Sequence, residues 1–237
     1  MRVKENCWLI TKPIAHRGLF SDYFPENSIP AYQNAIDNGY AIETDVFLSK
    51  DGALVCVHDD NLFRLTGKNE LVYNLTLKEI KSLSLLGTNQ KIPTLKETLS
   101  LCENKTPLLI EIKNQPSKKI VEKVLEELNG YKGEFAIQSF NPLYIIKLKK
   151  LAPSILRGIL SSKKPDTKNK FQASVVKNMP LNFIAKPDFI SYEHIWLPLN
   201  KRKTKDKIVL AWTVTNNKEH EKAKPYCNNI IFENFIP

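Results

Sequence analysis

Three acidic residues lie in two segments whose spacing could support metal chemistry. Glu43 and Asp45 are two residues apart in AIETDV, and Glu111 lies in PLLIEIK. Both segments predict β-strands, and residues two apart on a strand point to the same side. Three carboxylates without soft ligands favour one divalent cation, Mg²⁺ or Ca²⁺, over zinc or copper. The alternative is a cluster of salt bridges in which these acids pair with Arg17 and Lys113.

Two of the four histidines lie near the ends of predicted strands. His16 closes the first predicted strand, and His58 follows the apolar run LVCV. Imidazole can accept or donate a proton near neutral pH, so a pair flanking a phosphate could perform both proton transfers. A lone histidine beside an apolar strand is more often structural, which is the alternative for His58. His194 and His220 have no supporting residues around them and are interpreted as surface or structural.

The segments that must position these side chains alternate between strand and helix. Helical stretches begin near residue 28, cover 117–128 and 142–151, and lie around 218–224. This alternation predicts an α/β fold with parallel strands, and eight strands suggest a single (β/α)₈ TIM barrel, in which active sites form where the strands end. The eight apolar runs that predict strands are 13–16, 41–46, 107–113, 134–140, 156–162, 188–194, 208–214 and 229–234.

One segment interrupts the alternation after the second predicted strand. In DVFLSKDGALVCVHDD, the Asp51-Gly52 turn joins two β-compatible runs and predicts a β-hairpin. Such a hairpin would bring His58 back toward the end of the second strand. A short insertion, about residues 59–93, follows, and Thr76 and Glu79 have capping-box spacing for a helix within it.

Length and composition fit one globular domain over residues 1–237. No apolar run reaches the roughly 18 residues of a membrane span, so no stable membrane insertion is expected. The N-terminal segment lacks the apolar stretch of a signal peptide, which predicts a cytoplasmic location. The four cysteines are scattered and form no CxxC pair, so they are interpreted as reduced thiols rather than disulfides or zinc ligands.

The net charge of +10 is unevenly distributed along the chain. Residues 145–207 hold 15 Lys or Arg and 4 Asp or Glu. Such a zone could attract anionic substrates, nucleic acid or lipid, or it could reflect a lysine-rich composition with solvated helix faces. No basic stripe interleaved with aromatic residues accompanies it, so no nucleic-acid partner is expected.

Several motifs together resemble the glycerophosphodiester phosphodiesterase family. The segment from HRG to LTG, residues 16–67, contains HRG, PEN, E-x-D, DG and HD elements in the order of that family's N-terminal signature. The later blocks IPTLKETL, LLIEIK, QSFNP, AWTVTNN and IIFENF follow in the family's order, so the similarity spans nearly the whole chain. Thr215 and Glu233 depart from the commonest family pattern, which leaves the shape of the glycerol side open.

The resemblance implies a barrel fold, a divalent metal, and cleavage of glycerophosphodiesters to glycerol 3-phosphate and an alcohol. It also implies roles for residues of this chain, which complete the predicted site. These are catalytic His16 and His58; metal ligands Glu43, Asp45 and Glu111; substrate-binding Arg17, Lys113, Gln138, Phe140 and Trp212; and supporting Glu26, with Asn27 or Ser28 capping the first helix.

The expected partner is a small glycerophosphodiester, bound by a monomer or homodimer. Two other functions stay open at this point. A related barrel enzyme that acts on lysophospholipids would use nearly the same catalytic groups. An apolar loop facing a membrane would favour it, and the sequence shows no clear loop of that kind. A non-catalytic glycerophosphodiester-binding protein is the second, although such a protein would be expected to have lost a histidine or a metal carboxylate.

Overall fold

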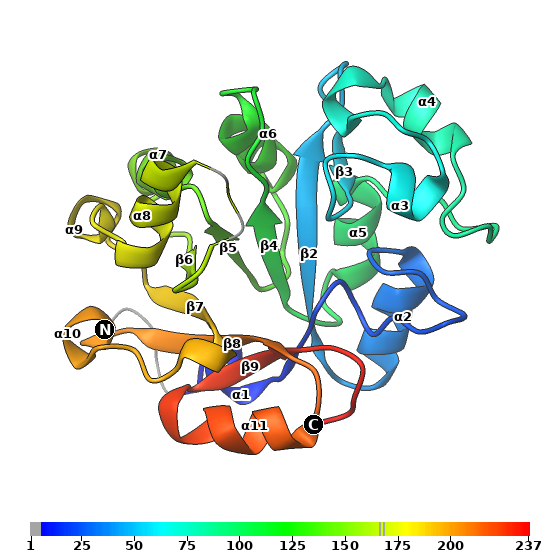
Figure 1. Ribbon diagram of the computed structural model, residues 1–237. Coiled ribbons are helices and arrows are strands. Elements are labelled where there is room, and N and C mark those ends of the chain that lie inside the picture. The colour runs from blue at the N-terminus through cyan, green and yellow to red at the C-terminus, as the bar shows by residue number, and fades with distance from the viewer. Residues whose placement is uncertain (1–5, 166, 168) are drawn as a thin grey trace. The chain divides into compact units, whose positions relative to one another are not determined.

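The computed structural model describes residues 6–165, 167 and 169–237, and it divides into two compact units. One unit comprises residues 15–135 and the other residues 1–14 with 136–237. Both alternate strands with helices along the chain (Figure 1).

In the unit of residues 15–135, two parallel strands form the base on which the acidic residues lie. Strand β2 (Ala41–Leu48) pairs with β4 (Leu108–Ile112), and every residue of both strands is buried. Burial on both faces explains why these strands are apolar except at Thr44 and the acidic positions. The register places Asp45 directly opposite Glu111.

The predicted β-hairpin after the second strand is present. Strand β3 (Leu54–Cys56) is antiparallel to β2, with Val46 opposite Cys56. Gly52 in the connecting turn has a φ of +85°, a backbone conformation that side chains other than glycine rarely adopt. Beyond β3, the Val57 amide still donates to the carbonyl oxygen of Asp45 at 3.1 Å, which carries the chain toward the acidic residues.

Two helices in this unit, α2 (Ile29–Asp37) and α5 (Leu95–Cys102), begin at side chains that accept hydrogen bonds from their first turns. Ser28 caps α2 by accepting from the Ala31 amide, which settles the choice between Asn27 and Ser28. Thr94 forms a capping box at α5. Helix α6 (Ile120–Glu127) carries its buried residues on one face.

The insertion folds into short helices over its own apolar cluster. It contains α3 (Phe63–Thr66), the 3₁₀ turn η1 (Val72–Asn74) and α4 (Leu77–Ser82), drawn in cyan in Figure 1. The predicted capping box of Thr76 and Glu79 is present at α4. Apolar residues of these helices pack with those of β2 and β3, including Phe47, Val55 and Leu65, so the insertion is anchored to the hairpin.

The other unit contains the remaining strands in chain order. β6 (Arg157–Ser161), β7 (Phe189–Glu193), β8 (Ile208–Val214) and β9 (Asn229–Phe232) are parallel neighbours, and β5 (Phe135–Ser139) pairs with β6. The accompanying helices are α1 (Trp8–Thr11), α7 (Pro142–Leu151), α8 (Lys170–Asn178), α9 (Asn182–Ala185), α10 (Lys201–Thr204) and α11 (Asn217–Ala223), with 3₁₀ turns η2 (His194–Trp196) and η3 (Lys224–Tyr226).

With the short β1 (Ile14–Ala15), all eight predicted strands are present, and β3 is the additional hairpin strand. This element order is that of a (β/α)₈ barrel with a hairpin and an insertion after the second strand, so the predicted fold class is confirmed. A single domain over residues 1–237 stays a prediction. Among the described residues, none of the helices has the length and apolarity needed to cross a membrane.

All four cysteines are free thiols, and that none of them binds zinc stays a prediction. Cys56 and Cys102 are buried. Burial raises the pKa of Cys56 to about 11, as expected for an unreactive thiol held in the core.

Candidate active site

The three predicted carboxylates converge at the ends of β2 and β4. Each of Glu43, Asp45 and Glu111 offers a carboxylate oxygen that lies within 4.8 Å of those of the other two. Their exposed fractions are 1%, 0% and 7%. The two-residue spacing on β2 and the pairing of Asp45 with Glu111 together place them on one side of the sheet.

Burial and mutual repulsion perturb these carboxyl groups. Removal from water raises the pKa of Glu43 well above its usual range, and the charges of Asp45 and Glu111 raise it further. Burial also raises the pKa of Glu111. The pKa of Asp45 is lowered, because the charge of Lys113, followed by those of His58, Arg17 and His16, outweighs the effect of burial.

The oxygen atoms of this cluster fit a divalent cation. Glu43 Oε1 is buried and has no hydrogen-bond partner, whereas Asp45 Oδ1 lies in an ion pair with Lys113. Buried carboxylate oxygens without partners are costly unless a charge neutralises them. An all-oxygen donor set suits a hard cation, so these residues could hold a divalent metal.

Two basic residues flank the carboxylates, as the sequence predicted. Lys113 Nζ lies 3.2 Å from Asp45 Oδ1 and 3.0 Å from Glu111 Oε1. The backbone amide of Arg17 donates to Glu43 Oε2 at 3.1 Å, and its Nε lies 3.8 Å from Asp45 Oδ2. Ion pairs of the alternative prediction, a cluster of salt bridges, therefore exist, yet they leave Glu43 Oε1 without a partner.

The glycine of the HRG motif is required by close packing. Gly18 has a φ of +79°, and a Cβ added there would lie 2.8 Å from the carbonyl carbon of Ala31 on α2. Arg17 itself has a φ of +57°. This tight loop directs the Arg17 amide and side chain toward the acidic cluster.

The asparagine of the PEN motif orients a metal-ligand candidate, which the sequence analysis missed. Asn27 Nδ2 donates to Asp45 Oδ2 at 3.0 Å, and Asn27 Oδ1 accepts from the Tyr32 hydroxyl at 2.9 Å. Tyr32 also lies 2.7 Å from the hydroxyl of Thr44. The PEN motif followed by a predicted helix was the available signal, but it suggested only a helix cap.

Glu26 connects two arginines beside the cluster. Arg17 Nη1 donates to Glu26 Oε1 at 2.7 Å, and Arg64 from the insertion donates to both Glu26 oxygens. These bonds lower the pKa of Glu26 despite its burial. Glu26 therefore stays ionised, in agreement with a supporting position.

The two predicted catalytic histidines lie near the carboxylates. His16 Nε2 is 4.0 Å from Glu43 Oε2. His58 Nδ1 is 2.7 Å from Asp59 Oδ1, and His58 is near enough to Asp45 to contribute to the lowered pKa of that carboxyl group. The hairpin thus brings His58 to the cluster, whereas an arrangement in which the two imidazoles face one phosphate stays a prediction.

The three predicted pocket residues lie in the other unit. Gln138 is buried and accepts from the Ser191 hydroxyl at 2.7 Å. Phe140 and Trp212 form an edge-to-face pair with ring centroids 5.5 Å apart, and Trp212 Nε1 is buried without a hydrogen-bond partner. Their roles toward substrate stay predictions. His194 lies 3.5 Å from Glu219, so it does have an acidic neighbour.

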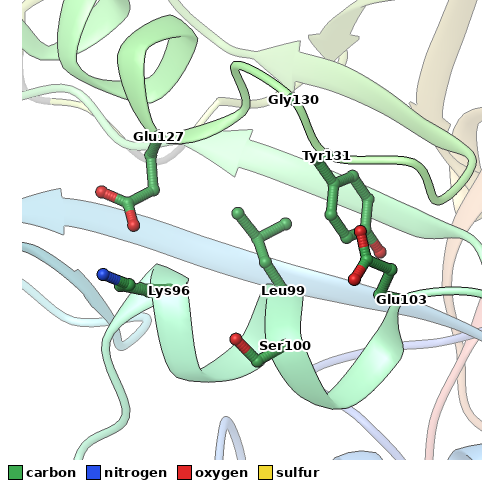
Figure 2. A pocket seen from close by; sticks show the side chains of 7 residues that line it. All are labelled: Lys96, Leu99, Ser100, Glu103, Glu127, Gly130 and Tyr131. Atoms are coloured by element: carbon green, nitrogen blue, oxygen red, sulfur yellow. The ribbon is translucent and has the colours of Figure 1, made fainter.

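A separate shallow pocket lies beside α5 and carries none of the predicted residues. Its volume is about 190 Å³. Figure 2 shows the side chains of Leu99 and Tyr131 pointing into the space between α5 and the turn after α6. No histidine or cluster of carboxylates lines it, so it offers no comparable chemistry; its lining residues are Lys96, Leu99, Ser100, Glu103, Glu127, Gly130 and Tyr131.

Comparison with known proteins agrees with this geometry. The chain belongs to the glycerophosphoryl diester phosphodiesterase family, whose model matches residues 16–236. The Bacillus subtilis protein YhdW, named a putative glycerophosphodiester phosphodiesterase, is 32% identical over 230 residues, 89% of each chain. A glycerophosphodiester phosphodiesterase of Caldanaerobacter subterraneus is 39% identical over 63% of this chain and 66% of its own length.

Solved structures show the same fold. A phosphodiesterase of Oleispira antarctica, solved in complex with the product sn-glycerol-3-phosphate, is 25% identical, with a TM-score of 0.77 over 94% of this chain and 93% of its own. A glycerophosphodiester phosphodiesterase of Parabacteroides distasonis has a TM-score of 0.75 at 22% identity, covering 93% and 92%.

Proposed function

We propose that this protein hydrolyses glycerophosphodiesters to glycerol 3-phosphate and an alcohol. The observation that carries the proposal is the convergence of Glu43, Asp45 and Glu111 in one buried cluster, with His16 and His58 beside it. Family membership and the product complex of the Oleispira relative support the same substrate class.

We propose that the three carboxylates hold one divalent cation, Mg²⁺ or Ca²⁺. The convergence of the three carboxylates and the buried Oε1 of Glu43, which has no hydrogen-bond partner, support this. When bound, such an ion would neutralise charge that develops on the phosphate oxygens. Asn27 would keep the Asp45 carboxylate oriented, and the Arg17 amide would do the same for Glu43.

The two histidines would carry the proton transfers. One would take the proton from the glycerol hydroxyl next to the phosphate, and that oxygen would attack phosphorus. The other would protonate the departing alcohol oxygen as its bond to phosphorus breaks. Water would then open the cyclic phosphate with the two roles exchanged, giving glycerol 3-phosphate.

Arg17 and Lys113 would bind the phosphate oxygens and stabilise their growing negative charge. Both side chains are mostly buried, and Lys113 keeps its charge because Asp45 and Glu111 raise its pKa in spite of burial. A buried cation acts more strongly on a phosphate than an exposed one, because water screens it less. Gln138, Phe140 and Trp212 are proposed as substrate-binding residues on the basis of the family resemblance.

Direct attack by water remains the alternative to a cyclic phosphate. A substrate methylated on the adjacent hydroxyl separates the two, because it cannot supply the internal nucleophile. It should bind but turn over very slowly if that hydroxyl attacks, and at a normal rate if water does.

The deciding experiment measures glycerol 3-phosphate release from a panel of glycerophosphodiesters, with and without EDTA. Release that depends on Mg²⁺, Ca²⁺ or Mn²⁺ supports the proposal. Binding without turnover under all three ions would instead favour a non-catalytic binding protein. The expected setting is a cytoplasmic monomer or homodimer with a small-molecule substrate.

Exposed aromatic residues beside the site favour one second candidate, a lipid phosphodiesterase. Tyr23 and Phe63 are 85% and 64% exposed, and they lie close in sequence to Glu26 and Arg64, which are hydrogen-bonded to each other. Exposed aromatic side chains of this kind could contact an acyl chain. Lysophosphatidylcholine belongs in the substrate panel for this reason, and Tyr23→Ser with Phe63→Ser should lower its turnover selectively if it is a substrate.

A further inference from the structure

Arg64 enters the site from the insertion, and the predicted roles did not include it. It lies on the one-turn helix α3, which ends at Gly67 in the left-handed conformation. Its side chain is 48% exposed. Its hydrogen bonds to Glu26 and Asp59 make it part of a network of charges rather than an isolated surface pair.

The guanidinium of Arg64 binds two carboxylates at once. Nη1 and Nη2 donate to the two oxygens of Glu26 at 2.8 and 2.7 Å, and Nε donates to Asp59 Oδ2 at 2.5 Å. Three donors in one rigid plane fix the positions of both carboxylates relative to each other. Lysine could not reproduce this, because its ammonium lacks the planar fork.

Each of these carboxylates also holds a residue of the proposed reaction. Asp59 Oδ1 lies 2.7 Å from His58 Nδ1, and Glu26 Oε1 accepts from Arg17 Nη1 at 2.7 Å. The result is one hydrogen-bonded chain that runs from His58 through Asp59, Arg64 and Glu26 to Arg17. A carboxylate on Nδ1 fixes the imidazole orientation and leaves Nε2 for proton transfer.

We propose that Arg64 is a positioning residue for the reaction, orienting His58 through Asp59 and Arg17 through Glu26. The inference rests on the proposed function. The insertion after the second strand would then supply Arg64, which connects a proton-transfer group, His58, with a phosphate-binding group, Arg17. Small displacements of such groups cost much of the rate, so loss of the link should be visible in turnover.

The test compares Arg64→Ala with His58→Ala on two substrates, glycerophosphocholine and a p-nitrophenyl glycerophosphodiester. Arg64→Ala should lower kcat by about 10- to 100-fold. The ratio between its kcat losses on the two substrates should equal the ratio measured for His58→Ala. The reason is that leaving alcohols of different acidity depend to different extents on the same proton-transfer group. Added guanidinium ion should restore part of the activity of Arg64→Ala but none of that of His58→Ala, and Arg64→Lys should stay impaired.

A second variant and a readout without turnover keep the test independent of folding. Asp59→Asn removes the carboxylate that contacts His58 and should show the same substrate pattern. In metal-free protein labelled with ¹⁵N-histidine, both variants should change the ring-nitrogen shifts of His58. Lys81→Ala breaks an ion pair between another residue of the insertion and Glu97 on α5; it is the matched control and should change neither the substrate pattern nor the His58 shifts.

Two results would overturn the inference. One is a lowered melting temperature of Arg64→Ala with wild-type kcat and wild-type substrate pattern. The other is unchanged His58 shifts in both variants. A wild-type enzyme without phosphodiesterase activity would refute the proposed function instead, whereas the shift measurement would still report whether Arg64 orients His58.

Discussion

Replacing Glu43 by glutamine should stabilise the metal-free protein and abolish its stabilisation by metal. Glu43 lies within 4.8 Å of Asp45 and Glu111, and all three carboxylates are buried. One pair of unit charges at 4.8 Å costs about 3.5 kcal/mol at an effective dielectric constant of ~20. Glutamine keeps an oxygen that can accept the hydrogen bond from the Arg17 amide, but it removes the negative charge.

The gain in free energy of unfolding is smaller than the pairwise repulsion. The charge of Arg17 offsets part of that repulsion, and protonation of Glu43 in the wild type removes more of it. We expect Glu43→Gln to raise the free energy of unfolding by roughly 1–3 kcal/mol without metal, a rise in melting temperature of about 3–10 °C for a chain of this size. Wild-type protein at a metal concentration of about 100 times Kd should gain ~2.7 kcal/mol. The variant should gain almost none.

The pH dependence gives a second check on the same variant. A carboxyl group whose folded-state pKa is raised leaves stability intact below its unfolded pKa, about 4.3 for glutamate. Stability is then lost as the pH rises toward the folded-state pKa. The advantage of Glu43→Gln should therefore be small near pH 4 and grow toward pH 8.

The assay is thermal unfolding with EDTA, Mg²⁺, Ca²⁺ or Mn²⁺, with calorimetric titration of the ions. Glu126→Gln is the matched control, because that glutamate is 62% exposed and lies in a surface pair with Lys123. It should change stability by less than about 0.5 kcal/mol. If Glu43→Gln were less stable than wild type in EDTA, and wild type gained nothing from any of the ions, the cluster would not be a cation site.

Three further changes follow from the same site. His16→Ala and His58→Ala should each lose about 10²–10⁴-fold in turnover with fold and metal binding retained, and the double variant should be little worse than the poorer single one; wild-type rates in both would remove the acid–base pair. Gly18→Ala should cost about 1–3 kcal/mol in urea unfolding, because both its φ and its contact with α2 exclude a methyl group; an unchanged midpoint would contradict the packing argument. The hydrogen bond from His58 lowers the pKa of Asp59, so its stabilisation is present above about pH 3.9 and is lost as the pH falls below that; Asp59→Asn should flatten this acid limb, and parallel curves for the two proteins would argue against it.

Local chemistry explains why much of the fold could be predicted. Apolar runs marked all eight strands, and the carboxylates two residues apart on β2 had to share a side because strand side chains alternate. The capping box at Thr76 and the turn at Gly52 depend on neighbours only a few residues away. Such features are encoded in short segments, so a single sequence was enough to find them.

Pairings between distant segments were decided by tertiary structure. The register that sets Asp45 opposite Glu111 depends on how two strands 66 residues apart align, which no local pattern specifies. The sequence left either Asn27 or Ser28 as the cap of the first helix; in the structure Ser28 is the cap, and Asn27 donates to Asp45.

Arg64 had no sequence signal beyond its charge, because its partner Glu26 lies 38 residues away. Sequence therefore determined which residue types were present and which side of each strand they occupied. The folded chain decided which of them meet, since a hydrogen bond needs its atoms within about 3 Å and only the packing of separate elements brings them that close.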